Sequence, residues 1–112
     1  MKLWIDDVRP APDGYVWCKS VRRAKWAIKK FEEYRQKAIN NGYTHETLPA
    51  LDLIDIDHDA GDWACDGGDY IKLLDWLEYT GRNYPIRIHS MNPVGRENMR
   101  RIIQKNGWRE VF

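Results

Sequence analysis

Short apolar runs alternate along the chain with longer segments in which apolar residues recur at helical spacing. Each run has the length of a β-strand, and most of the runs lead directly into polar residues. The five predicted strands are residues 2–5, 15–18, 51–57, 86–89 and 108–112. Helical spacing follows Ser20, Asp69 and Asn92, which predicts three helices. This alternation is typical of an α/β domain built on a parallel sheet.

Residues with special backbone preferences predict where the elements begin and end. Ser20 is a good N-cap for the longest helix, which is expected to stop near Asn41. The last helix is expected to start after Asn92 and to end at Gly107. Two prolines and a glycine make residues 9–14 a loop. The predicted fold is a three-layer α/β sandwich, with helices on both faces of a five-stranded, mostly parallel sheet.

Length and composition limit what the protein can be. A chain of 112 residues has room for one core, so residues 1–112 are expected to form a single domain. The formal net charge of +1 gives no general attraction to a polyanion or an anionic membrane. No apolar run approaches the roughly 20 residues that span a bilayer. We therefore expect a soluble, cytoplasmic protein without a membrane partner, in which Cys18 and Cys65 are reduced thiols.

Ionisable side chains gather at the predicted strand ends, which meet at one edge of a parallel sheet. Asp6 and Asp7 follow the first strand, and Asp57 ends the third. Adjacent carboxylates repel each other, and a hard cation such as Mg²⁺ relieves this repulsion. The sequence therefore predicts a possible Mg²⁺ site at Asp6, Asp7 and Asp57 and no other cofactor. A solvated turn without an ion is the competing interpretation.

Two of the three histidines fall at the same predicted edge. His58 lies between Asp57 and Asp59, and neighbouring carboxylates favour the imidazolium form that suits a general acid. His89 ends the fourth strand. Two imidazoles facing one phosphorus could serve as base and acid in opening or closing a cyclic phosphate. Zinc binding is the weakest option, since no helical His pair supports it. A structural role for each histidine is the alternative.

A phosphate site is predicted where the fourth strand leads into the last helix. The N-terminus of this helix, after Asn92, has free backbone amides and the positive end of the helix dipole. Arg96 in its first turn could add a bidentate contact. With Arg9 and Ser90, these residues form the predicted substrate-binding set.

Three segments together resemble the cyclic-phosphate-processing receiver-like domain family: residues 4–10 (WIDDVRP), 57–61 (DHDAG) and 89–99 (HSMNPVGRENM). The order and spacing match over nearly the whole chain, and the last segment is the most specific. The resemblance implies a compact variant of the receiver (flavodoxin-like) fold. It also implies action on cyclic phosphate ends of RNA or on related nucleotides.

The resemblance extends to single positions, and it has two departures. The matching residues are Asp6, Asp7, Arg9, Asp57, His58, Asp59, His89, Ser90 and Asn92. Ala60 stands where the family tends to have a larger apolar residue, and Asp55 where a small or neutral one is expected. No exit lysine precedes the predicted fifth strand, and the first helix of a receiver is reduced to the loop of residues 9–14. Both features argue against aspartyl phosphorylation.

The leading hypothesis is a phosphoesterase-like enzyme, a cyclic phosphodiesterase with His58, His89, Asp57 and Asp7 as its catalytic residues. Its partner would be a nucleotide or an RNA terminus that carries a 2′,3′-cyclic phosphate. One alternative is a module that binds or sequesters such an end without cleaving it. Another is a degenerate phospho-receiver that signals through a partner. These functions use the same residue types, so the sequence leaves them open.

Overall fold

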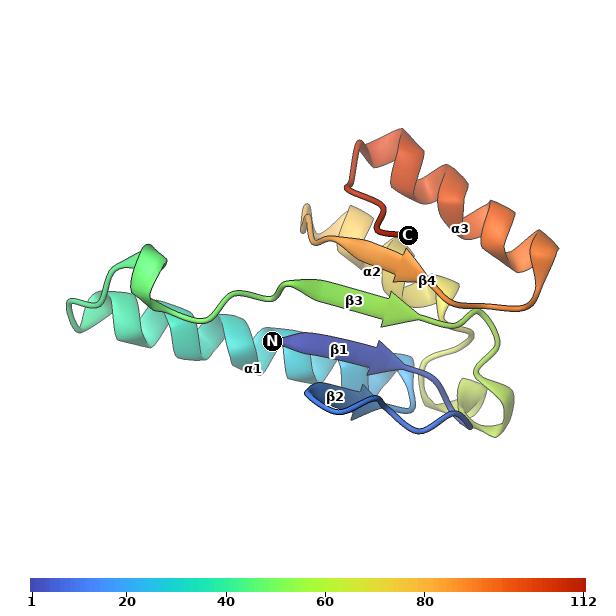
Figure 1. Cartoon of the computed structure of the whole chain (residues 1–112), viewed down its shortest axis with the longest axis horizontal. Coiled ribbons are helices and arrows are strands. Elements are labelled where there is room, and N and C mark those ends of the chain that lie inside the picture. The colour runs from blue at the N-terminus through green and yellow to red at the C-terminus, as the bar shows by residue number, and fades with distance from the viewer.

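Four short parallel strands form one sheet in the computed structural model, which describes residues 1–112 (Figure 1). The strands are β1 (Lys2–Ile5), β2 (Tyr15–Cys18), β3 (Leu53–Ile56) and β4 (Ile86–Ile88). The helices are α1 (Val21–Asn40), α2 (Ile71–Tyr79) and α3 (Pro93–Asn106), with 3₁₀ turns η1 (His45–Thr47) and η2 (Gly61–Asp66). The strands all point toward the same edge, where the polar exit loops lie (Figure 1).

The strand order is β2-β1-β3-β4, which matches the first four positions of the flavodoxin-like order. β1 and β3 are the central strands, and Leu3 pairs with Ile54 in their register. The order reverses direction between these two strands, and ligands of open α/β sheets bind beyond the carboxyl ends at such a point. The loop of residues 6–14 joins β1 to β2 without a helix, as predicted.

All three helices cover the same face of the sheet. Fully buried Ile5, Ile54 and Ile86 belong to one hydrophobic core with buried residues of α1, α2 and α3. On the opposite face, Lys2 and Arg87 are exposed. The prediction of three layers is therefore wrong: the domain has two, because the loop after β1 replaces the helix that would cover the second face. The α/β class and the parallel sheet are confirmed.

The predicted fifth strand is also wrong, since the sheet has four strands. After α3, the backbone N–H of Trp108 bonds to the carbonyl of Ile103 and keeps the chain at the helix end. The segment reaches β4 only at Glu110, which forms an isolated bridge with Ile86. The bridge consists of two hydrogen bonds, from the Ile86 amide to the Arg109 carbonyl at 3.0 Å and from the Val111 amide to the Ile86 carbonyl at 2.8 Å. One bridge does not continue into a strand, although buried Trp108 still closes the core.

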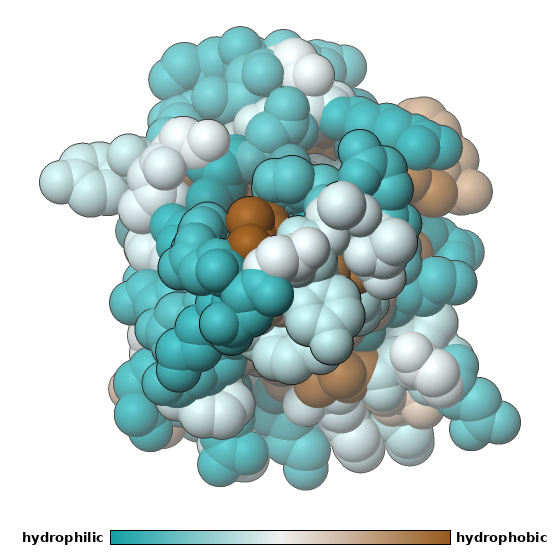
Figure 2. Space-filling view, turned by 90° about the vertical axis from the view of Figure 1, so that its left-hand side faces the viewer, coloured by the Kyte–Doolittle hydropathy of each residue, from teal (hydrophilic) through white to brown (hydrophobic).

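The predicted boundaries of α1 and α3 are confirmed, whereas Asp69 does not cap α2: Tyr70 is its N-cap, and Asp69 Oδ1 accepts from the Ala60 amide. The Ser20 hydroxyl accepts from the Arg23 amide at 3.1 Å, so it caps α1 as expected. The backbone of Gly107 is left-handed, with φ 66°, and ends α3. No helix combines the length and the apolar character that crossing a membrane requires. The end of the molecule away from the strand exits is mainly hydrophilic, with only small hydrophobic spots (Figure 2).

Candidate functional site

Three carboxylates meet where β1 and β3 end. One oxygen from each of Asp6, Asp7 and Asp57 lies within 4.8 Å of the other two. Asp6 and Asp7 follow β1 directly and Asp57 follows β3, so the parallel register of these strands brings the three side chains together. We call Asp6, Asp7 and Asp57 the acidic cluster.

Asp6 is the buried and most fixed member of the acidic cluster, with 1% of its surface exposed. Its Oδ1 accepts from the amides of Val8 and Arg9, both at 2.9 Å, and its Oδ2 contacts His89 Nε2 at 2.9 Å. Burial raises the pKa of Asp6, but these hydrogen bonds outweigh burial and hold its pKa below the ordinary value. Asp6 is therefore a carboxylate at neutral pH.

Asp7 is in the opposite electrostatic situation. Burial and the neighbouring charges of Asp6, Asp57 and Asp62 raise its pKa. Gly61 lies so close to Asp7 that a Cβ at position 61 would overlap Asp7 Oδ2. The carboxylate oxygens of the cluster are the ligands that Mg²⁺ prefers, and their mutual repulsion is what a cation would relieve. The donor set therefore fits a divalent cation.

His89 is held on both sides by carboxylates. Its Nδ1 contacts Asp55 Oδ1 at 2.6 Å, while its Nε2 contacts Asp6 Oδ2. Trp4 stacks on the imidazole, with ring centroids 3.9 Å apart and planes 3° from parallel. An ionised carboxylate only accepts hydrogen bonds, so both contacts are satisfied together when both ring nitrogens carry protons. With 9% of its side chain exposed, His89 has no ring nitrogen left for a ligand.

Asp55 is one of the two carboxylates that hold His89. No role was predicted for it from the sequence. It is fully buried in the middle of β3, and its Oδ2 makes no hydrogen bond, although Arg87 Nη1 lies 3.6 Å away. Strand alternation puts Asp55, Arg87 and His89 on the same face of the sheet. A buried mid-strand Asp followed by a strand-end His was the signal in the sequence. Trp4, on the same face of β1, gave no comparable signal.

His58 lies away from His89, and no hydrogen bond or ring contact joins the two imidazoles. Its Nδ1 contacts Asp59 Oδ1 at 2.8 Å. When Nδ1–H donates this hydrogen bond to the Asp59 carboxylate, the neutral imidazole keeps a lone pair on Nε2, which makes no hydrogen bond within the chain. A Cβ at Gly95 would overlap the His58 ring, so α3 packs directly against this imidazole.

The start of α3 is largely satisfied by its own side chains. Asn92 Oδ1 accepts from the Gly95 amide at 3.0 Å, and buried Ser90 Oγ accepts from the Asn92 amide at 3.1 Å. Pro93 has no N–H, so the Val94 amide is the one left without a hydrogen bond in this turn. Helix amides alone therefore offer little to a phosphate here.

Two arginines flank the site in different ways. Arg9 Nη1 donates to the His89 carbonyl at 3.1 Å, which ties the loop after β1 to the end of β4. Arg96 is exposed, and its guanidinium makes no hydrogen bond or ion pair. Arg9 therefore has a structural contact, whereas Arg96 is free to contact a ligand. Their predicted role in substrate binding stays a prediction.

Tyr70 lies beneath the site and was not singled out from the sequence. It is fully buried at the start of α2, and its hydroxyl donates to the Lys19 carbonyl at 2.7 Å. Its amide donates to the His58 carbonyl at 3.1 Å. Burial and the negative charge of Asp7, Asp6 and Asp57 raise its pKa far above the ordinary value. Tyr70 therefore stays neutral and fixes the backbone behind the cluster.

The structure thus brings most of the predicted site residues to the same end of the sheet, but it divides them into separate groups. Asp6, Asp7, Asp57 and His89 form one connected group, to which Arg9 is joined. His58 and Asp59 form a second pair against α3, and Ser90 and Asn92 build the helix start. The departures from the family pattern are accommodated, since Ala60 is fully buried and Asp55 pairs with His89.

Comparison with known proteins identifies the family. No curated protein and no solved structure matches the chain. The family model described as the cyclic-phosphate processing receiver domain matches residues 1–105. Because this match covers nearly the whole chain, the protein belongs to the cyclic-phosphate processing receiver domain family.

Proposed function

We propose that the protein is a phosphoesterase that acts on 2′,3′-cyclic phosphates of RNA ends or nucleotides. The observation that carries this proposal is the pairing of a carboxylate-oriented imidazole, His58, with an acidic cluster at the same strand edge. Membership in a family associated with cyclic-phosphate processing supports the substrate class.

In this proposal His58 exchanges the proton. Asp59 orients the ring and leaves Nε2 free to take a proton from water while the water oxygen bonds to phosphorus. One ring P–O bond then breaks, and His58 returns the proton to the leaving ribose oxygen. Asp6, Asp7 and Asp57 would hold a divalent cation such as Mg²⁺, which would neutralise charge on the phosphoryl oxygens. Arg96 would contact the phosphate, since its guanidinium has no partner within the chain.

His89 has a different task in this proposal. Both of its ring nitrogens already contact carboxylates, so it would act through Asp6 rather than on the substrate. A protonated His89 would offset the charge of Asp6 and Asp55 and keep Asp6 in place within the acidic cluster. His89 is therefore proposed as a positioning residue, and His58 as the catalytic one.

The test is turnover of 2′,3′-cyclic nucleotides and of RNA with a 3′-terminal cyclic phosphate, with and without Mg²⁺. We expect His58→Ala to lower kcat by about 10²- to 10⁴-fold, the usual contribution of a general acid or base. His45→Ala is the matched control, because His45 is exposed in η1, away from the strand exits. Absence of turnover in the wild type would refute catalysis. Equal turnover in His58→Ala would refute the catalytic role of His58. Binding with the ligand recovered intact would favour the sequestering module.

One observation favours a second candidate, a phospho-receiver. Asp57 stands at the end of β3 beside Asp6 and Asp7, where a metal-assisted phosphoryl transfer to a carboxylate could take place. Against it, β1 leads into a loop and not into the first helix of a receiver. Incubation with acetyl phosphate and Mg²⁺, followed by mass spectrometry, tests this candidate: label on Asp57 or Asp59 supports it, and unlabelled protein excludes it for this donor.

A further inference from the structure

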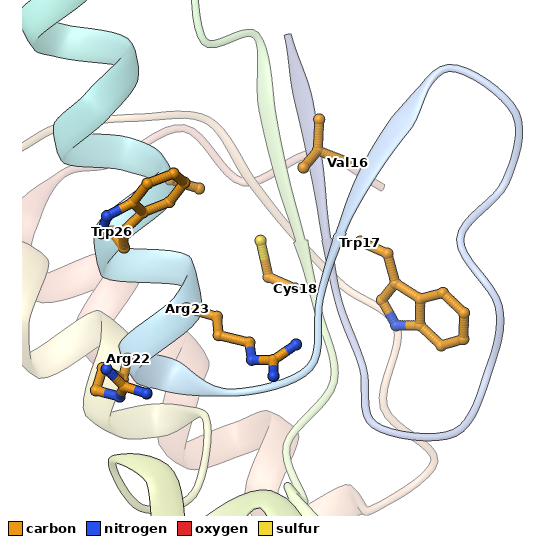
Figure 3. Close-up of a pocket in the computed structure, with 7 residues that line it drawn as sticks. Val16, Trp17, Cys18, Arg22, Arg23 and Trp26 are labelled. Atoms are coloured by element: carbon orange, nitrogen blue, oxygen red, sulfur yellow. The ribbon is translucent and has the colours of Figure 1, made fainter.

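A slot of about 380 Å³ opens between the free edge of β2 and the first turns of α1 (Figure 3). Cys18 lies at its back and Val16 extends along the strand side, whereas the indole of Trp17 is directed away from α1 (Figure 3). Trp26 rises from α1 on the other side, with Arg23 reaching across below (Figure 3). The volume falls at the small end of the range for ligand pockets, about 300–1,000 Å³.

Two indoles near this strand edge are exposed, but only Trp26 faces the slot, since the Trp17 ring points to the other side of β2 (Figure 3). Trp26 is 63% exposed and Trp17 is 37% exposed, and neither belongs to the hydrophobic core. An exposed indole face provides a surface on which a planar ring can stack, and every nucleobase has such a face. The slot can therefore accept a base without reading its sequence.

Positive charge accompanies these rings. Arg22 and Arg23 line the slot, and no carboxylate lines it. Arg22 is paired with Asp66, at 2.6 Å between Nε and Oδ1, whereas Arg23 forms no ion pair. The Arg23 guanidinium stacks on Trp63, 4.5 Å from its ring centroid. Because the net charge of the chain is only +1, this concentration of cations is a local feature that suits phosphates.

A chain of contacts links the Arg23 side of the slot with the acidic cluster. Trp17 Nε1 donates to the backbone carbonyl of Asp6 at 2.6 Å, and the Asp6 amide donates to the Cys18 carbonyl at 3.3 Å. Lys19 lies between the two regions, with its ammonium 4.6 Å from the Trp17 ring and 5.9 Å from the Trp63 ring. A basic and aromatic surface therefore runs from the cluster to Trp26.

We propose that this surface binds the single-stranded RNA segment that precedes the terminal cyclic phosphate, with one base stacked on Trp26 in the slot. The inference rests on the proposed function and narrows its substrate class: an oligoribonucleotide end is preferred over a free cyclic mononucleotide. Lys19 and Arg23 neutralise backbone phosphates between the slot and the reacting end. A protein partner could also pack against the exposed rings, but the phosphates of RNA are the better match for the cations Lys19 and Arg23.

Binding can be measured apart from catalysis. A labelled oligoribonucleotide that ends in a plain 3′-phosphate cannot be cleaved at a cyclic phosphate, and fluorescence anisotropy gives its Kd. We expect Trp26→Ala to raise this Kd roughly 5- to 100-fold, the effect of losing one stacked base. Arg23→Gln should reduce the slope of log affinity against log salt by about 0.7, the value for one phosphate contact on a single strand.

Tyr79→Ala is the matched control, since Tyr79 is an aromatic residue 90% exposed at the end of α2. It should leave the Kd within about twofold of the wild type, and Trp26→Phe should retain most of the binding because a ring remains. Unchanged affinity in Trp26→Ala and Arg23→Gln, or no oligonucleotide binding at all, would overturn the inference. Dimerisation that depends on Trp26 in sedimentation experiments would overturn it in favour of a second copy of the chain.

The two proposals fail in different ways. If cyclic ends are not turned over but the oligoribonucleotide still binds through Trp26, the slot is supported and catalysis fails. If turnover occurs with equal kcat/KM for the oligonucleotide and the mononucleotide, the proposed function stands and the slot is refuted. Support for both requires a higher kcat/KM for the oligonucleotide, with a ratio that falls in Trp26→Ala.

Discussion

Single carboxylates in the acidic cluster experience different environments although they lie close together. Asp6 is stabilised as a charged group by two amides and His89, so its pKa is lowered. Burial, followed by the negative charge of Asp6 and Asp57, raises the pKa of Asp7. The repulsion between Asp7 and its neighbours favours binding of a cation. Without the cation, the same repulsion lowers the stability of the folded protein.

Asp7→Asn is therefore expected to stabilise the metal-free protein, by a few tenths to about 1 kcal/mol at neutral pH. Because the folded pKa of Asp7 is raised, its contribution to stability is most favourable at low pH and is lost as pH rises through that pKa. The gain should therefore vanish below about pH 4, near the ordinary Asp pKa. Urea unfolding at several pH values measures it.

Mg²⁺ provides the complementary readout for the same variant. A cation that binds only the folded protein stabilises it by about 2.7 kcal/mol at 100 times its Kd. The Tm of the wild type should rise with Mg²⁺, and the Tm of Asp7→Asn should rise much less. Asp52→Asn, at an exposed carboxylate near the N-terminus, is the control that should keep the full response. Equal responses in both variants would contradict a metal site at the cluster.

Gly95 is a second residue whose identity is dictated by its neighbour. Gly95→Ala places a methyl group in the His58 ring, so the ring or α3 must shift. We expect a loss of roughly 1–3 kcal/mol in the free energy of unfolding, as in other overpacked sites, together with reduced turnover. Val94→Ala, one residue earlier and 70% exposed, should change neither quantity appreciably. Full activity in Gly95→Ala would show that the position of His58 is unimportant.

At this scale the sequence predicted which residues lie at the site better than it predicted their contacts. Asp6, Asp7 and Asp57 follow strand ends, and strand ends in a parallel sheet converge, so the cluster could be foreseen. The two carboxylates around His89 could not, because they depend on register between β3 and β4. In the sequence Asp55 was notable as a departure from the family pattern, and the structure pairs it with His89.

Among the elements, the junction between β4 and α3 has the clearest structural logic. Ser90 bonds to the Asn92 amide, and Asn92 then caps α3 through Gly95. These side chains set the direction in which α3 leaves the sheet and therefore place Gly95 against His58. The cap of α3 thus affects where the His58 imidazole can lie.

Asn92→Ala should cost about 1 kcal/mol in the free energy of unfolding, the typical value for a lost N-cap. Asn92→Asp keeps the capping oxygen and should retain most of that stability. Ser20→Ala, which removes the cap of α1, provides a comparison at a distant helix start. Chemical denaturation measures all three. A cost for Asn92→Ala well below that for Ser20→Ala would argue that the first turn of α3 finds another cap.

Elements with strong local signals were predicted correctly, and those that depend on distant contacts were not. The caps at Ser20 and Asn92 and the stop at Gly107 act on their own helix, so α1 and α3 have the expected bounds. The last segment is apolar enough for a strand, yet the end of α3 holds Trp108 and leaves only Glu110 to pair with β4. Local hydrophobicity does not contain that information.

Across the whole molecule, the arrangement in two layers decides which groups the sheet presents to water. The helix-covered face contains Leu3, Ile5 and Ile54, while the other face contains Lys2, Trp4 and Arg87. Whether the second face of the sheet is covered depends on whether a helix forms between β1 and β2. The prolines in that loop were recognised, but their consequence for the layers was not drawn from the sequence.

Replacement of Lys2 and Arg87 by leucine should make the uncovered face more apolar, at some cost in stability because Arg87 Nη1 lies 3.6 Å from buried Asp55 Oδ2. Exposed apolar patches of several hundred square ångströms promote association, so we expect the double variant to self-associate at concentrations where the wild type does not. Size-exclusion chromatography coupled to light scattering measures this. Lys37→Leu with Gln104→Leu, at exposed positions on two helices, is the matched control, and equal association in both variants would contradict a special role of the sheet face.

The loop that replaces the first crossover helix also affects how the protein can evolve and be engineered. Residues 10–14 are exposed or partly exposed and belong to no helix or strand, and chain insertions are best tolerated at such positions. The same loop starts at Asp6 and Asp7, so any segment inserted there would lie beside the acidic cluster. The missing helix thus makes this loop a natural entry point for new specificity, because added residues could reach the substrate without disturbing the core.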